Sequence, residues 1–198
     1  MCTLLAAGTL ATWFAPALVW DWQPLLAARQ PWRWWSAAFV HWSEMHLAAN
    51  LAALAVVAAM GRVARVPLQV TLAWLTSWPL LHLALLLRPE LAHYGGLSGL
   101  LHAGAAVAAT YLALYGPPKQ RGIGWLILIT LIAKILWEAP WGPVLRHQAG
   151  WDIAVAPLAH ASGAVLGIAC TLLALAMLPQ RKSRRPGLSS TFQTTNQP

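Results

Sequence analysis

The sequence carries very little charge. Only 9% of its 198 residues are charged and 59% are apolar, whereas about 25% of the residues in an average soluble protein are charged. Acidic residues are the least common charged type: the sequence has five Asp and Glu and 13 Lys and Arg, which gives a net charge of +8. Apolar stretches long enough to cross a bilayer recur along the chain. This composition excludes an ordinary soluble domain and indicates a polytopic membrane domain.

Cysteine is almost absent as well. Cys2 and Cys170 are the two in the sequence, one near each end, which excludes a disulfide framework and a paired-cysteine metal site. The seven histidines show no spacing that would bring two or three metal ligands together. We therefore expect no metal site and no cofactor.

The apolar pattern predicts an all-α membrane protein, a bundle of six transmembrane helices formed by residues 1–178. Pro79 is expected to kink the third helix, and Gly116-Pro117-Pro118 to end the fourth. A tryptophan-rich outer loop at 21–42 separates the first two, and the basic, polar tail at 179–198 is expected to be disordered and cytoplasmic. The six helices are predicted at residues 3–20, 45–60, 68–87, 98–115, 124–137 and 155–178.

The positive charges predict the orientation. Eight of the 13 fall on the even-numbered turns and in the tail, which are cytoplasmic by the positive-inside rule: Arg62, Arg65, Lys119, Arg121, Arg181, Lys182, Arg184 and Arg185. All five acids fall on or near the opposite side, where most tryptophans also cluster as interfacial anchors. Both termini are thus expected in the cytoplasm. The net charge reflects contact with a lipid bilayer, and no nucleic-acid partner is expected.

A serine among glycines begins the fourth predicted helix, in the run Tyr94-Gly95-Gly96-Leu97-Ser98-Gly99. At a helix N-terminus the backbone N–H groups lack intrahelical partners, so a hydroxyl nucleophile and an oxyanion site can share one turn. On the motif alone, a helix-packing serine is the more common interpretation.

Polar residues in two other helices supply candidate partners. His46 and Asn50, four residues apart, share one face of the second helix and can donate hydrogen bonds to an anionic oxygen; a structural interhelical hydrogen bond is the alternative. In the sixth helix, His160 shares a face with Gly163 and Gly167. That small-residue face is expected to pack on Gly99 and its neighbours in the fourth helix, which would bring His160 to Ser98 below the outer surface.

Together these motifs resemble the rhomboid intramembrane serine proteases over nearly the whole chain. The family's H-x4-H-x3-N is matched by His41, His46 and Asn50, its G-x-S-G by residues 96–99, its last-helix motif by His160, Gly163 and Gly167, and its outer-loop Trp-Arg pair by Trp32-Arg33. The resemblance implies a Ser98–His160 dyad and an oxyanion hole of the Ser98 N–H, His46 and Asn50. Gly96, Gly99, Gly163 and Gly167 would pack around it. No acid is expected to orient His160.

Within that family the compact chain, the run Gly96–His102 and the pattern Lys134-x-x-Trp137-Glu138 resemble the rhombosortase branch. This implies a bacterial inner-membrane enzyme that opens to the periplasmic side and cleaves the C-terminal Gly-Gly, transmembrane and basic tail of secreted proteins. Lys134 and Glu138, an i,i+4 pair, are interpreted as a brace within the fifth helix rather than a substrate contact.

Two other functions remain open from the sequence. A rhomboid-like protein that binds membrane helices without cutting them is the principal alternative, although such relatives usually lose the Ser–His pair. A small transporter would show an inverted repeat or paired broken helices, and neither is evident. The sequence carries no signal for an oligomeric state.

Overall fold

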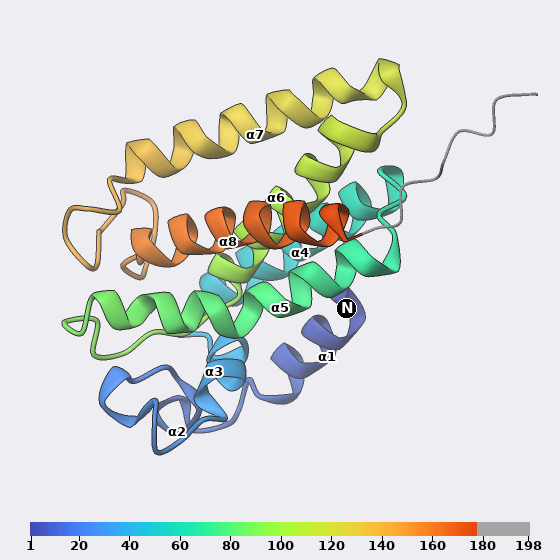
Figure 1. Ribbon diagram of the computed structural model, residues 1–198. Helices are drawn as coiled ribbons and strands as arrows, with labels where there is room; N and C mark the ends of the chain where they lie inside the picture. The colour runs from blue at the N-terminus through green and yellow to red at the C-terminus, as the bar shows by residue number, and fades with distance from the viewer. Residues whose placement is uncertain (178–198) are drawn as a thin grey trace, which may run out of the picture.

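The computed structural model describes residues 1–177, which form helices and two isolated β-bridges but no strand. Five helices are long and apolar enough to cross a membrane. They are α4 (Glu44–Val63), α5 (Leu68–Ala84, continued by a 3₁₀ turn at Leu85–Leu87), α6 (Ser98–Tyr115), α7 (Pro118–Glu138) and α8 (Pro157–Ala176). In Figure 1, α8 lies between α7 and α5 with α6 crossing behind it. The chain is therefore a multi-pass α-helical membrane protein.

Helix α6 forms the centre of this bundle. It contacts α4, α5, α7 and α8, and 67% of it is buried inside the protein, against 22% of α4 and 17% of α7. Its sequence explains this position, because it is rich in alanine and glycine and so lets neighbouring helices approach closely. Ser98, the first residue of α6, is thereby held by a rigid, enclosed helix.

The contact between α6 and α8 is a backbone contact. A Cβ at Gly167 would lie 2.5 Å from the Ala103 carbonyl oxygen, and a Cβ at Gly163 would overlap the Gly99 carbonyl oxygen. In return, a Cβ at Gly99 would come within 2.9 Å of the Ala159 carbonyl oxygen. Glycine at these three positions allows the two helices to touch along the turns that carry Ser98 and His160.

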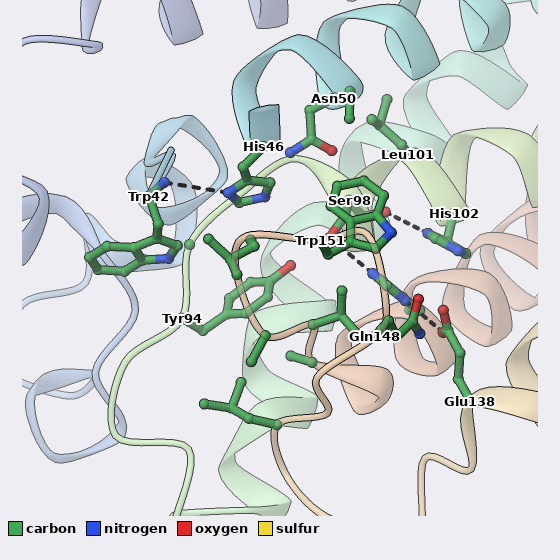
Figure 2. A pocket seen from close by; sticks show the side chains of 18 of the residues that line it. Trp42, His46, Asn50, Tyr94, Ser98, Leu101, His102, Glu138, Gln148 and Trp151 are labelled. Carbon is green, nitrogen blue, oxygen red and sulfur yellow. Dashed lines mark hydrogen bonds and ion pairs between the residues drawn. The ribbon is translucent and has the colours of Figure 1, made fainter. Parts of the chain in front are cut away.

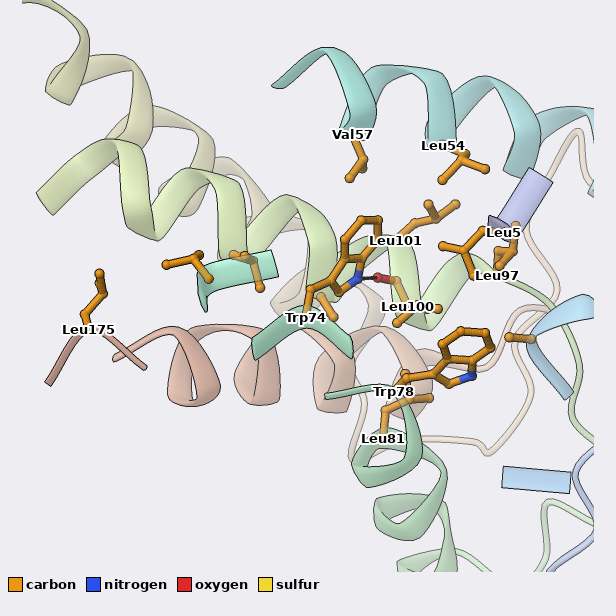
Figure 3. Close-up of a cluster of buried hydrophobic side chains, with 14 residues drawn as sticks. Leu5, Leu54, Val57, Trp74, Trp78, Leu81, Leu97, Leu100, Leu101 and Leu175 are labelled. Carbon is orange, nitrogen blue, oxygen red and sulfur yellow. Dashed lines mark hydrogen bonds between the residues drawn. The ribbon is translucent and has the colours of Figure 1, made fainter. Parts of the chain in front are cut away.

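Aromatic and leucine side chains fill the space between α4, α5 and α6 (Figure 3). The Trp74 indole Nε1–H donates a hydrogen bond to the Leu100 carbonyl oxygen at 2.8 Å. The indole of Trp78 packs edge-on against Phe39 of the outer loop. This core fixes the register of α6 against α5 just below the site.

The N-terminal segment differs from the sequence prediction. Instead of one helix over residues 3–20, the chain forms α1 (Cys2–Ala11), a turn, and α2 (Ala17–Trp20). Ten helical residues rise only about 15 Å, half of a hydrocarbon core. Pro16 prevents the helix from continuing, since it has no N–H to donate to the Thr12 carbonyl and its ring would clash with that group. The prediction of a continuous first helix is therefore wrong.

The start of α7 also differs from the prediction, and the outer loop shows further detail. Helix α7 begins at Pro118, six residues before the predicted start, because proline is favoured in the first turn of a helix and the polar Lys119–Arg121 run continues it. The tryptophan-rich outer loop at 21–42 carries short helical turns, at Pro24–Leu26, α3 (Arg33–Ser36) and Ala37–Phe39. The tail predicted to be disordered, residues 179–198, lies outside the described residues.

Candidate active site

Ser98 is the first residue of α6 and follows a tight loop. Gly96 in that loop has φ of +122°, a conformation that side chains rarely adopt, and a Cβ there would lie 2.6 Å from the His46 ring. The Gly96 N–H donates a hydrogen bond to the Ala37 carbonyl oxygen at 2.9 Å, which joins the loop before Ser98 to the outer loop at 21–42. The loop therefore delivers Ser98 to the helix start with its hydroxyl facing a cavity (Figure 2).

His160 of α8 reaches Ser98 from the neighbouring helix. Its Nε2 lies 3.1 Å from Ser98 Oγ, and the imidazole is buried, with 5% of the residue exposed. With the ring neutral and the proton on Nδ1, Nε2 accepts a hydrogen bond from the serine hydroxyl. In this geometry a histidine can accept the proton of a serine hydroxyl.

Glu138, at the C-terminal end of α7, contacts the other side of the same ring. Its Oε2 lies 2.7 Å from His160 Nδ1, and the residue is 3% exposed. The expectation that no acid lies near His160 is therefore wrong. The pair of Glu138 with Lys134 that the sequence predicts is also present: Lys134 Nζ donates to Glu138 Oε1 at 2.5 Å.

His102, one turn after Ser98, completes a ring of polar contacts. Its imidazole stacks on that of His160 with centroids 4.1 Å apart and planes 11° from parallel. Its Nδ1–H donates to the Ser98 carbonyl oxygen at 2.7 Å, and its Nε2 accepts from Lys134 Nζ at 3.0 Å. The hydrogen bond to Ser98 lies within one helix, whereas the stacking on His160 depends on how α6 packs against α8.

His46 and Asn50 of α4 line the cavity opposite this network (Figure 2). The Trp42 backbone N–H points at His46 Nδ1 at 3.4 Å, which leaves Nε2 as the donor of the neutral ring. Asn50 Nδ2 is buried and has no hydrogen-bond partner among the described residues. An unpartnered buried amide is costly, so a ligand oxygen in the cavity is its natural acceptor.

The cavity itself measures about 270 Å³ and is walled by two loops. The loop before Ser98 contributes His93, Tyr94 and Gly95, and the loop after α7 contributes Gln148, Trp151 and residues 153–156. Burial raises the pKa of the Tyr94 phenol to about 12, so the hydroxyl stays protonated. The opening thus lies at one end of the bundle, between these two loops.

A buried ion pair fixes the outer loop to the loop that precedes Ser98. Arg33 Nη1 lies 2.9 Å from Asp21 Oδ1, and His93 Nδ1 lies 2.6 Å from Asp21 Oδ2. Trp22 and Tyr94 exchange two backbone hydrogen bonds beside it, at 2.7 and 3.0 Å. The sequence signalled Arg33 through the Trp-Arg pair, but not its partner Asp21.

His41 supports the site from one side. Its ring centroid lies 4.8 Å from that of His46, and its Nδ1 lies 3.1 Å from the Phe39 carbonyl oxygen. Burial lowers the pKa of His41, which favours the neutral ring. Over residues 1–177, no three His, Cys, Asp or Glu side chains are grouped as ligands for a metal ion.

These features define a class: a multi-pass helical membrane protein with a serine, a histidine and a carboxylate joined by hydrogen bonds in a cavity at the ends of its helices. Residues 28–177 match the family model of the Rhomboid domain. The chain therefore belongs to the rhomboid family, which is of the intramembrane serine protease type. No curated protein matches the chain.

Proposed function

We propose that the protein is an intramembrane serine endopeptidase in which Ser98 is the nucleophile and His160 the general base. The observation that carries this proposal is the 3.1 Å contact between Ser98 Oγ and His160 Nε2 at the wall of the cavity. Both groups belong to rigid helices whose backbones touch, so their geometry is fixed before substrate binds.

In the first step, Ser98 Oγ attacks the carbonyl carbon of the scissile peptide bond. As the C–O bond forms, the hydroxyl proton passes to His160 Nε2 and the carbonyl π electrons move to the oxygen. His160 then gives that proton to the leaving nitrogen as the C–N bond breaks, which releases an amine and leaves an acyl-enzyme. A water molecule repeats the sequence: its proton goes to His160, its oxygen attacks the ester, and Ser98 recovers its proton.

The oxyanion formed in each step needs hydrogen-bond donors. Asn50 Nδ2–H, His46 Nε2–H and the Ser98 backbone N–H are the proposed donors, and all three residues line the cavity. The free Asn50 amide supports this role, since it has no other acceptor among the described residues. Gly96 and Gly99 serve by leaving room for the His46 ring and for α8.

The substrates proposed are membrane-anchored proteins, in particular secreted proteins with a C-terminal Gly-Gly, transmembrane and basic tail, as in the rhombosortase branch. We place the enzyme in a bacterial inner membrane with both termini in the cytoplasm and the cavity toward the periplasm. The charge distribution supports this topology. So does the position of Met1, which lines a cavity with Arg62 at the far end of α4. Residues 1–22 would then provide a sixth crossing as a broken helix.

The alternative is a rhomboid-like protein that binds membrane helices without cutting them. A hydrogen-bonded Ser98–His160 pair argues against it, because a binding protein does not need a buried serine aligned with a base. The same cavity would serve both functions, so only a measurement of peptide cleavage separates them.

Co-expression with a tagged Gly-Gly-tailed substrate tests the proposal. The wild type is expected to convert the substrate to a shorter form, and Ser98→Ala to leave it intact. Equal processing in both strains would rule out the protease function. If the wild type does not process the substrate and a fluorophosphonate does not label Ser98, the binding protein would be favoured.

A further inference from the structure

We propose that Glu138 is a positioning residue for His160, so that the site works as a Ser98–His160–Glu138 triad with Lys134 holding the carboxylate. This inference rests on the proposed protease function. It assigns Glu138 a part in catalysis beyond that of bracing α7.

The geometry of the two carboxylate oxygens separates the two roles. A brace within α7 uses Oε1, which receives the Lys134 ammonium at 2.5 Å. Oε2 instead faces His160 Nδ1 of another helix at 2.7 Å, the distance of a strong charge-assisted hydrogen bond. Glu138 and His160 are 3% and 5% exposed, so the contact is largely shielded from bulk solvent.

The contact sets which ring nitrogen carries the proton. A carboxylate is only an acceptor, so Nδ1 must donate to it, and Nε2 is left free to accept the Ser98 proton. When that proton arrives, the ring becomes a cation 2.7 Å from a fixed negative charge. Glu138 therefore selects the reactive tautomer and stabilises the imidazolium, while the proton itself stays on His160.

Lys134 and His102 restrain the carboxylate and the ring. Lys134 Nζ contacts both Glu138 Oε1 and His102 Nε2, and His102 in turn donates to the Ser98 carbonyl oxygen. A ring of five contacts thus returns to its starting residue, and the stacked His102 prevents His160 from tilting. Only helices α6, α7 and α8 contribute to this ring, and all three are spanning helices.

The test compares Glu138→Gln with the wild type and with Glu90→Gln, in intact membranes. Glu90 is an exposed loop residue whose side chain is 64% accessible, so its substitution makes the same chemical change outside the site. Each protein is treated with a fluorophosphonate, and both the final fraction of labelled Ser98 and the rate of labelling are measured. The fraction counts folded sites, whereas the rate reports the activation of each site.

We expect Glu138→Gln to reach the wild-type fraction at a rate about 10²–10⁴-fold lower, and to cleave substrate with a correspondingly lower kcat but a KM within about twofold. Glu138→Asp keeps an ionised carboxylate one methylene further away and is expected to fall between the two. Glu90→Gln should match the wild type.

Three results would overturn the inference: a wild-type rate in Glu138→Gln, a reduced labelled fraction with a normal rate in the remaining sites, or an Asp variant no faster than the Gln variant. The second would reduce Glu138 to a structural brace. None of these three results would contradict the proposed protease function. That function is contradicted instead if Ser98→Ala processes substrate as the wild type does.

Discussion

Replacing Gly163 by alanine tests how strictly the site depends on backbone contact between α6 and α8. The new Cβ would overlap the Gly99 carbonyl oxygen, which is part of the helix backbone and cannot rotate away as a side chain can. Gly163 lies one turn after His160, and Gly99 follows Ser98 directly. Relief of the overlap must therefore move Ser98 and His160 apart.

The size of this movement follows from the next contact along the same face. A Cβ at Gly167 would lie 2.5 Å from the Ala103 carbonyl oxygen, about 0.9 Å short of the 3.4 Å at which ordinary contact begins. The overlap at Gly163 is larger, so about 1 Å is a lower bound there. Adding 1 Å to the 3.1 Å between Ser98 Oγ and His160 Nε2 breaks their hydrogen bond. We expect kcat to fall about 10²-fold or more, and overpacking to lower the free energy of unfolding by about 1–3 kcal/mol.

The assay is cleavage of a tagged substrate by purified enzyme in detergent, with unfolding followed in the same micelles. Gly122→Ala is the matched control, because a Cβ at Gly122 meets nothing within 4 Å and alanine favours the helix. It should keep full activity and equal or exceed the stability of the wild type. Wild-type kcat in Gly163→Ala would refute the argument that a backbone contact sets the Ser98–His160 distance.

Three further predictions concern side chains around the site. Asn50→Ala should lower kcat about 10²–10³-fold with little change in KM, as the loss of one oxyanion donor does; a loss under threefold would remove Asn50 from that role. Lys134→Met leaves a buried carboxylate without its countercharge and should lower kcat about tenfold, the equivalent of one charge-assisted hydrogen bond; unchanged kinetics in the cleavage assay would contradict this. Asp21→Asn leaves the Arg33 guanidinium buried without its charge partner and should lower the free energy of unfolding by about 3 kcal/mol; a denaturation midpoint equal to that of the wild type would show the ion pair to be neutral for stability.

The sequence predicted α6 with the same bounds that the structure shows, because both ends carry local signals: a glycine-rich turn before Ser98 and Gly116-Pro117-Pro118 after it. The prediction of one helix over residues 3–20 was wrong, because hydropathy counts apolar residues without regard to the break that Pro16 imposes. The start of α7 was predicted too late in the chain. Polar residues at a helix N-terminus lower the hydropathy but not the tendency to form a helix.

The grouping of site residues within one helix could be predicted from the sequence, whereas the contact of Glu138 with another helix could not. Spacing within one helix was sufficient to group His160 with Gly163 and Gly167, and His46 with Asn50, since a helical face repeats predictably. Glu138 was assigned to its i,i+4 neighbour Lys134, which is a correct local contact. Its second contact, to His160, depends on how α7 lies against α8. A carboxylate within an apolar chain was the available signal, because a buried acid requires a partner.

The central claim is that Ser98 is a nucleophile activated by His160. Its most direct test is to treat the protein in membranes with a fluorophosphonate and to identify the modified residue by peptide mass spectrometry, in the wild type and in His160→Ala. We expect modification of Ser98 in the wild type and none in the variant over the same time. Label on another residue, or equal labelling of Ser98 without the histidine, would contradict it.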